Sequence, residues 1–274
     1  MGGLTAAMLL LQAGTAQALI SQHVETRFLP TTGTATIDFD TVDDSGGPIA
    51  TSILAEVTGP FGRATASAGP AGNLGIDQYQ AQEGELTSEV TILNTDIPNL
   101  LGVERHATAN FIIDGGSLAL YAEVGSSLFF LIELEASIQN SIGTEVRHET
   151  WTSRILMSAD TGPIPDVQFL DNDIGAVVQA NGFIVDIPFS FQTFDLGLIP
   201  ANGSVGLSYR AFASSEVVGF AELASAQFSD PLNLTNPVEA PTVTYAPVPA
   251  PASALLVITG LGLMGALRRR RRAA

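Results

Sequence analysis

Hydrophobic and polar residues alternate along most of this chain, and the longest alternating run covers residues 128–138. Every second residue of that run is apolar, while Glu133, Glu135 and Ser137 occupy positions between. A period of two places successive side chains on opposite faces of a β-strand. The run therefore predicts a strand with one buried face, which consists of Leu128, Phe130, Ile132, Leu134, Ala136 and Ile138.

Similar runs on either side are joined by short turns that contain glycine, namely 114–116, 125–126 and 140–143. Short turns between alternating runs are typical of antiparallel hairpins. We therefore expect one antiparallel meander of four strands, at residues 109–113, 118–124, 128–138 and 145–157.

Further strands are expected in the second half of the chain. Asn181-Gly182 favours a type I′ turn, which predicts a hairpin between 177–180 and 183–191. One face of its second strand would carry Phe183, Val185, Ile187, Phe189 and Phe191. Later strands are expected at 205–211, after the turn Ala201-Asn202-Gly203, and at 217–228. Residues 41–73, which are rich in Gly, Pro, Ala and Thr, are expected to form loops between short strands.

This pattern predicts an all-β fold. No segment between the chain ends has the apolar stripe of an amphipathic helix, so crossover helices are not expected. The fold class expected for residues 19–235 is an antiparallel β-sandwich, jelly-roll-like in its connections. Two smaller sandwiches divided near residues 161–165 are the alternative, but that segment is short for a linker, which favours one domain.

Charge and cysteine content exclude several classes of function. The chain has a net charge of −17, no lysine and no cysteine. Outside a run of five arginines at its end, six arginines face 28 acidic residues, which leaves a net charge of about −22. Such a surface repels nucleic acid, so no polynucleotide partner is expected. Without cysteine there is no disulfide, no thiolate metal site and no cysteine nucleophile.

The C-terminal tail combines three elements in a fixed order. A proline-rich segment at 236–251 ends in the motif Val248, Pro249, Ala250, Pro251 and Ala252. Residues 252–267 are uncharged and would form a hydrophobic helix about 24 Å long, slightly shorter than a bilayer core. The basic cluster that follows, Arg268, Arg269, Arg270, Arg271 and Arg272, is expected to stay in the cytoplasm and leave residues 236–251 as an extended spacer outside.

This tail resembles the VPLPA variant of the PEP-CTERM sorting signal over Val248–Arg272, with Ala250 at a position where that pattern usually has leucine. The resemblance implies recognition by an exosortase, a membrane protease of Gram-negative bacteria. It also implies passage through the inner membrane and delivery to the cell surface or extracellular matrix after tail removal. PEP-CTERM proteins commonly accompany exopolysaccharide loci, so polysaccharide is the implied partner. The preceding domain resembles no family that we recognise.

The N-terminal end agrees with export. A short apolar segment at 4–12 precedes Ala16-Gln17-Ala18, and small residues at Ala16 and Ala18 are typical of a signal-peptidase site. Residues 1–18 are therefore interpreted as a signal peptide. Because no Lys or Arg precedes Arg27, we expect the true start to lie further upstream.

Acidic clusters suggest one possible cofactor, calcium. Ca²⁺ prefers several oxygen ligands on irregular loops. One candidate set is Asp38, Asp40, Asp43 and Asp44, and the other is Asp166, Asp171, Asn172 and Asp173. Neither follows the EF-hand order. The alternative, which a chain this acidic favours, is that both sets are solvated loops without a cofactor.

Other candidate chemistry is sparse, and no enzymatic activity is expected. Glu133 and Glu135 lie two apart on one strand face and could form the carboxylate pair of a glycosidase, but alternate glutamates are better explained as a solvated strand face. The three histidines, His23, His106 and His148, have no metal-ligand spacing.

Trp151 and Tyr121 are the candidate ligand contacts. Trp151 shares the parity of Arg147 and Glu149 on a face interpreted as polar, and Tyr121 shares a face with Glu123. A solvent-facing aromatic ring suits stacking against sugar.

The leading interpretation is an exported surface or matrix protein that associates with exopolysaccharide. The alternatives are a calcium-stabilised adhesion or surface-layer module and a secreted glycan hydrolase.

Overall fold

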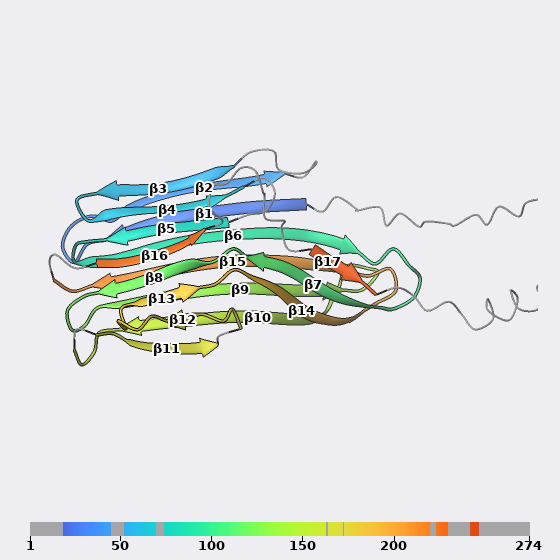
Figure 1. The fold of residues 1–274 in the computed structure, drawn as a ribbon. Coiled ribbons are helices and arrows are strands. Elements are labelled where there is room, and N and C mark those ends of the chain that lie inside the picture. Colours follow the sequence, from blue (N-terminus) through green and yellow to red (C-terminus); the bar gives the residue numbers. More distant parts are fainter. Residues whose placement is uncertain are drawn as a thin grey trace, which may run out of the picture.

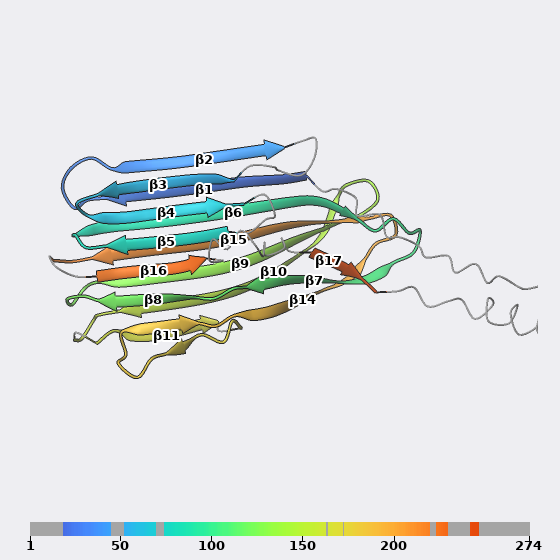
Figure 2. The ribbon, with the colours of Figure 1, turned by 45° about the horizontal axis from the view of Figure 1, so that its top comes forward.

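The computed structural model describes residues 19–44, 52–69, 74–162, 164–171, 173–219, 223–229 and 242–246. The described residues form antiparallel strands in two large sheets that pack face to face, with a smaller third sheet beside one end (Figures 1 and 2). The predicted all-β sandwich is therefore confirmed.

Each sheet combines strands from distant parts of the chain. Sheet A has the spatial order β11 (Asp166–Asp171), β10 (Glu145–Ser158), β9 (Ser127–Gln139), β15 (Ser204–Val217), β6 (Gly84–Pro98), β1 (Leu19–Leu29) and β2 (Thr36–Asp44). Sheet B has the order β12 (Val177–Val178), β13 (Ile184–Ile187), β8 (Gly116–Tyr121), β16 (Leu223–Ser229), β5 (Leu74–Gln80), β4 (Gly62–Ala68) and β3 (Ile53–Gly59). Sheet C consists of β14 (Ser190–Ile199), β7 (Arg105–Ile113) and β17 (Thr242–Tyr245).

Strand β9 forms the centre of the core. It pairs along its length with β10 on one side and β15 on the other. All six residues of its predicted buried face, from Leu128 to Ile138, are fully buried. Phe130 meets Phe228 of sheet B with ring centroids 5.2 Å apart, so the two sheets interlock through this face.

The predicted four-strand meander is wrong, although its strands lie near the expected residues. β7, β8 and β9 belong to three different sheets, and of the three hairpins expected in this meander only β9–β10 forms. Consecutive strands cross between layers because each must bury one face against the opposite sheet. Such crossing is the connection style of a jelly-roll-like sandwich. Strand β9 also pairs with β10 and β15, which lie on either side of residues 161–165, so both halves of the chain share one sheet.

The true meander is β3–β4–β5, within and just beyond a region expected to form loops between short strands. Its inner face is built largely from alanine, with Ala55, Ala64, Ala66 and Ala68 all buried. Alanine alternating with serine and threonine gives a weak hydropathy signal, which explains why the bounds of these short strands were not predicted.

Three further expectations need correction. The β12–β13 hairpin forms, but its turn is not type I′, because Asn181 lacks the positive φ that this turn requires. Instead, Gly182 (φ 77°) donates its N–H to the Gln179 carbonyl at 2.9 Å.

Phe189 and Phe191 leave the predicted buried face, since they are 56% and 73% exposed beside sheet C. The expected last strand, 217–228, is instead the end of β15 and the separate strand β16.

A buried polar band crosses the interior between sheets A and B. Gln78 donates to the Ser215 hydroxyl at 2.7 Å and to the Leu86 carbonyl at 2.9 Å, while Ser88 donates to the Gln78 side-chain oxygen at 3.0 Å. These side chains are fully buried. Buried polar groups that satisfy each other cost little and fix how two sheets align.

Tyr209 of β15 gives the fold a specific sensitivity to alkali. Its ring is buried against Phe111 of sheet C, with centroids 5.5 Å apart. Burial raises the pKa of Tyr209, and the negative charge of Asp114 raises it further. The phenol therefore remains protonated in the folded state at pH values at which it ionises in the unfolded chain.

We expect stability to fall once the pH exceeds the ordinary tyrosine pKa of about 10, by on the order of 1 kcal/mol per pH unit, because only the unfolded state then loses the proton. Tyr209→Phe should remove this slope, as measured by urea unfolding between pH 9 and about 11. The chain has no lysine or cysteine to titrate in that window. An unchanged slope in Tyr209→Phe, with Tyr79→Phe as the exposed control, would contradict this assignment.

Candidate functional site

The most organised polar surface lies at the end of the sandwich toward which β17 runs. Three turns meet there, at residues 99–104, 140–144 and 200–203, and β1 begins at the same end (Figures 1 and 2). We call these turns the tail-side end. The residue that follows β17, Ala246, lies two positions before the predicted sorting motif. The geometry here therefore decides how the domain is joined to its tail.

Strand β17 corrects the interpretation of residues 236–251 as an extended spacer, because Thr242–Tyr245 pairs with β7. Arg105 of β7 holds its end: the guanidinium donates to the carbonyls of Tyr245 (3.1 Å) and Ala246 (2.8 Å). The same group lies 5.0 Å from the centroid of the Tyr245 ring. Tyr245 in turn donates its hydroxyl to the Ile97 carbonyl of β6 at 2.9 Å. The chain is thus fixed in place just before the motif.

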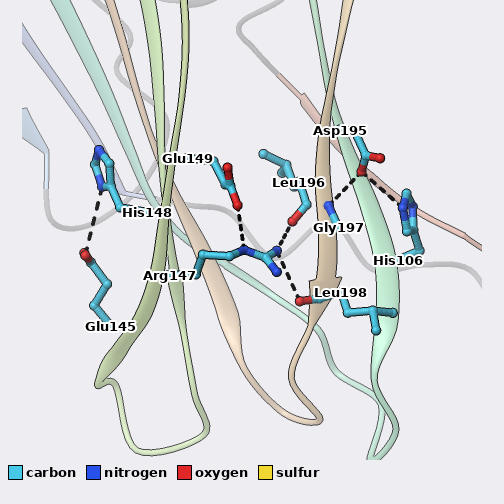
Figure 3. A network of polar contacts seen from close by, with 9 residues as sticks. All are labelled: His106, Glu145, Arg147, His148, Glu149, Asp195, Leu196, Gly197 and Leu198. Atoms are coloured by element: carbon cyan, nitrogen blue, oxygen red, sulfur yellow. Dashed lines mark hydrogen bonds and ion pairs between the residues drawn. The ribbon is translucent and has the colours of Figure 1, made fainter.

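Arg147 of β10 joins sheet A to sheet C (Figure 3). Its guanidinium donates to the Leu196 and Leu198 carbonyls of β14, and it forms a 2.9 Å ion pair with Glu149. A bulge between Asp195 and Gly197 allows both carbonyls to face this arginine. Gly197 has φ 66°, and a Cβ there would lie 3.0 Å from the guanidinium, so the bulge requires glycine.

His106 and Asp195 form a second contact within sheet C. His106 Nε2 lies 3.1 Å from Asp195 Oδ1, and the same carboxylate oxygen accepts the Gly197 N–H at 2.7 Å (Figure 3). His148 lies 4.0 Å from Glu145 on the neighbouring strand β10. These pairs are about half exposed; His106–Asp195 joins β7 to β14, whereas His148 and Glu145 lie on the same strand.

Asn99 organises the turns of the tail-side end. Its fully buried side chain donates to the carbonyls of Val103 and Pro200, each at 2.9 Å. Asn202 donates its backbone N–H to the Leu101 carbonyl at 3.0 Å. Two turns separated by about a hundred residues are thereby locked together. Sequence reasoning missed Asn99, Arg105 and Arg147; the only available signal was the scarcity of arginine outside the tail.

Trp151 does not face solvent as expected. It lies opposite Leu134 of β9, on the inner face, and its ring meets Phe111 edge-on at 4.9 Å. Tyr121 does face outward: it is 38% exposed and stacks on Phe183 at 4.8 Å. β8 and β10 belong to different sheets, so the two candidate ligand residues do not form one surface.

The acidic clusters do not lie on irregular loops facing a common site. Asp38 and Asp40 belong to strand β2, while Asp171 ends β11, at the opposite edge of sheet A. Asp38 accepts the Glu56 N–H at 2.8 Å, and Asp171 forms a 2.6 Å ion pair with Arg154.

Asp43 and Asp44 also lie in β2, but their side chains fall outside the described residues, as does Asn172. Asp166 is exposed in β11 and Asp173 in the following turn. Within the described ranges, no three His, Cys, Asp or Glu residues form a group able to hold a metal ion. Calcium binding stays a prediction.

Glu133 and Glu135 lie on the outer face of β9, as the solvated-face interpretation expects. Glu133 lies 3.9 Å from Arg210, which forms a closer, 2.8 Å pair with Glu89. His23 contacts Thr41 and Glu25 at the far edge of sheet A, away from His106 and His148.

The sorting calls fall outside the described residues. These are Ala16 and Ala18, the motif at 248–252, the hydrophobic helix at 252–267 and the arginines at 268–272. Among the residues that the structure describes, no helix has the length and apolar character needed to span a membrane.

Comparison with known proteins adds little. No family model and no curated protein matches the chain. Among solved structures, the infectious bursal disease virus VP2 subviral particle is similar over 82% of this chain and 70% of that chain, at 8% identity. The TM-score is 0.16, which is too low to support an argument about function.

We expect Arg105→Ala to loosen β17. Removing its partly exposed hydrogen bonds should cost on the order of 1 kcal/mol and increase amide exchange in 242–246 about fivefold. Hydrogen exchange read by mass spectrometry measures this directly. Arg63→Ala, which removes the same charge from an ion pair with Asp77, should leave that peptide unchanged. Equal protection in wild type and Arg105→Ala would refute the role given to Arg105.

Proposed function

We propose that this protein is exported and displayed at the cell surface or in the extracellular matrix, where it associates with exopolysaccharide. Its sorting proceeds through an exosortase-type protease at the inner membrane of a Gram-negative bacterium. In this proposal the β-sandwich is a binding or structural module and not an enzyme.

The tail carries this proposal. Val248–Ala252, the uncharged segment 252–267 and the five arginines occur in the order that a cut and sorted tail requires. The arginines oppose translocation, because each costs about 2.5–3.5 kcal/mol at the bilayer centre. The strongly acidic composition of the remaining chain fits a soluble domain in an ionic exterior.

The position of β17 supports the same proposal. Its pairing ends at Tyr245, and Ala246 donates its N–H to the His106 carbonyl at 2.8 Å. A cut within 248–252 would therefore fall outside every described strand. Among the residues that the structure describes, the strand pairing of the sandwich would be unaffected by loss of the tail.

We expect mature protein from the surface fraction of the native host to end within 248–252 and to lack the arginines. Intact-mass and terminal-peptide mass spectrometry measures this. Pro249→Ala, inside the motif, should accumulate uncut chain in the inner membrane, whereas Pro247→Ala, just outside it, should be processed normally. Surface protein that still carries Arg268–Arg272 would overturn the sorting proposal.

The outward aromatic pair Tyr121–Phe183 supports polysaccharide as the partner. The two rings are nearly parallel, with an interplanar angle of 15°, where β8 ends and the neighbouring strand β13 begins. A partly exposed aromatic surface with a phenolic hydroxyl suits a sugar ring, which presents an apolar face and hydroxyl groups.

Tyr121→Ala should reduce retention of the protein on exopolysaccharide from its own host by about fivefold, while Tyr121→Phe, which keeps the ring, should retain most of it. Co-sedimentation with purified polysaccharide measures both. The exposed Tyr79 has no aromatic neighbour among the ring contacts of the described residues, so Tyr79→Ala is the control. Undiminished binding by Tyr121→Ala would remove this pair from the proposal.

A further inference from the structure

The tail-side end differs from the rest of this acidic molecule in charge. Its three turns contain no charged residue from 99 to 103, from 140 to 144 or from 200 to 203. Turns at the opposite end of the sandwich carry Glu83, Glu123 and Asp160. The turns as a whole include one charged residue, Glu104, and Arg105 and Glu145 border them, so few acidic groups in these turns oppose contact with an apolar or anionic surface.

Large apolar side chains project from the same end. Ile142 is 83% exposed, Leu100 67% and Val103 46%, and Val146 and Leu198 beside them are each 54% exposed. Single exposed apolar residues are normal, but several at one end mark a surface that contacts another apolar phase.

These side chains are held in position by the backbone of the turns. Asn99 ties turn 99–104 to turn 200–203, as described above. In the third turn, the Asn140 side chain accepts the N–H groups of Ile142 and Thr144, each at 3.0 Å. The apolar groups are therefore presented by an organised surface.

The tail limits how far this end can lie from a bilayer. Arg105 fixes Ala246, and six residue steps lead from there to Ala252, where the apolar segment begins. A fully extended chain spans at most about 3.5 Å per residue, so the reach is about 20 Å. The headgroup layer itself occupies roughly 5–8 Å on each side of the hydrocarbon core.

We propose that the tail-side end is a membrane-contact surface, in which Leu100, Val103 and Ile142 enter the boundary between lipid headgroups and acyl chains while the tail is in the bilayer. This inference rests on the proposed function, because the tail supplies the tether. Its occupant is lipid. The acidic surface elsewhere keeps the long axis of the sandwich away from the membrane, so that the sorting motif lies at the interface.

The lack of cysteine allows a direct test with single nitroxide labels on the full chain in vesicles of phosphatidylethanolamine and phosphatidylglycerol. The labelled variants are Ile142→Cys at the tail-side end, Val257→Cys in the apolar segment and Val124→Cys at the opposite end. Val124 is a matched control, since it is 57% exposed in the turn after β8. Accessibility to oxygen and to a water-soluble nickel complex is read by electron paramagnetic resonance.

We expect the labels at 142 and 257 to favour oxygen over nickel by at least about threefold relative to the label at 124, as immersion in lipid requires. If the label at 142 is as accessible to nickel as the label at 124 while the label at 257 is in lipid, the proposed membrane contact is wrong but the sorting proposal is unaffected. A label at 142 shielded from both reagents indicates a protein occupant and also overturns it. If the label at 257 is accessible to nickel, the tail is not inserted in the bilayer, and both the insertion and the proposed membrane contact are refuted.

Discussion

The register of β9 is the constraint on which the remaining structure depends. Thirteen residues pair on both sides, and a slip by one position would bury Glu133 and Glu135 while exposing Phe130. This fixes which residues of the neighbouring strands point inward. Leu134 has Trp151 on one side and Tyr209 on the other, and Phe111 of sheet C contacts both rings. The attachment of sheet C therefore follows from the placement of one central strand.

Much of the fold can be predicted from the alternation of apolar and polar residues, because a strand with one buried face requires a period of two in the sequence. The predicted face of β9 is correct for this reason, and so is the sandwich class. Pairing partners were not readable: β9 pairs with β15, some 75 residues later, and no local signal specifies that. The alanine face of β4 was overlooked because Ala64, Ala66 and Ala68 are small and only mildly apolar, so their alternation with polar residues is weaker than that of the large side chains in β9.

The candidate site was less predictable, since its contacts join residues far apart in sequence and several use backbone carbonyls. Arg105 and Arg147 bind carbonyls of β17 and β14, which no side-chain motif reports. The error on Trp151 was avoidable, because Trp151 shares its parity with the buried Ile155 and Met157. Arg147 and Glu149 made that face look polar, but Arg147 donates to backbone carbonyls of β14 and pairs with Glu149, which the sequence does not show. Likewise, Ile37 and Phe39 alternate with Asp38 and indicate a strand where a cation-binding loop was considered.

The direction of β17 has a mechanical consequence. The strand runs toward the tail and pairs with β7 in antiparallel register, with Arg105 at its last residues. A force pulling on the tail along this axis loads the hydrogen bonds of the ladder together, in shear, and does not peel them apart one at a time. If the tail anchors the protein as proposed, force on the tail would thus pass into sheet C through hydrogen bonds loaded in shear. The four-residue strand β17 would therefore transmit tension on the tail to β7.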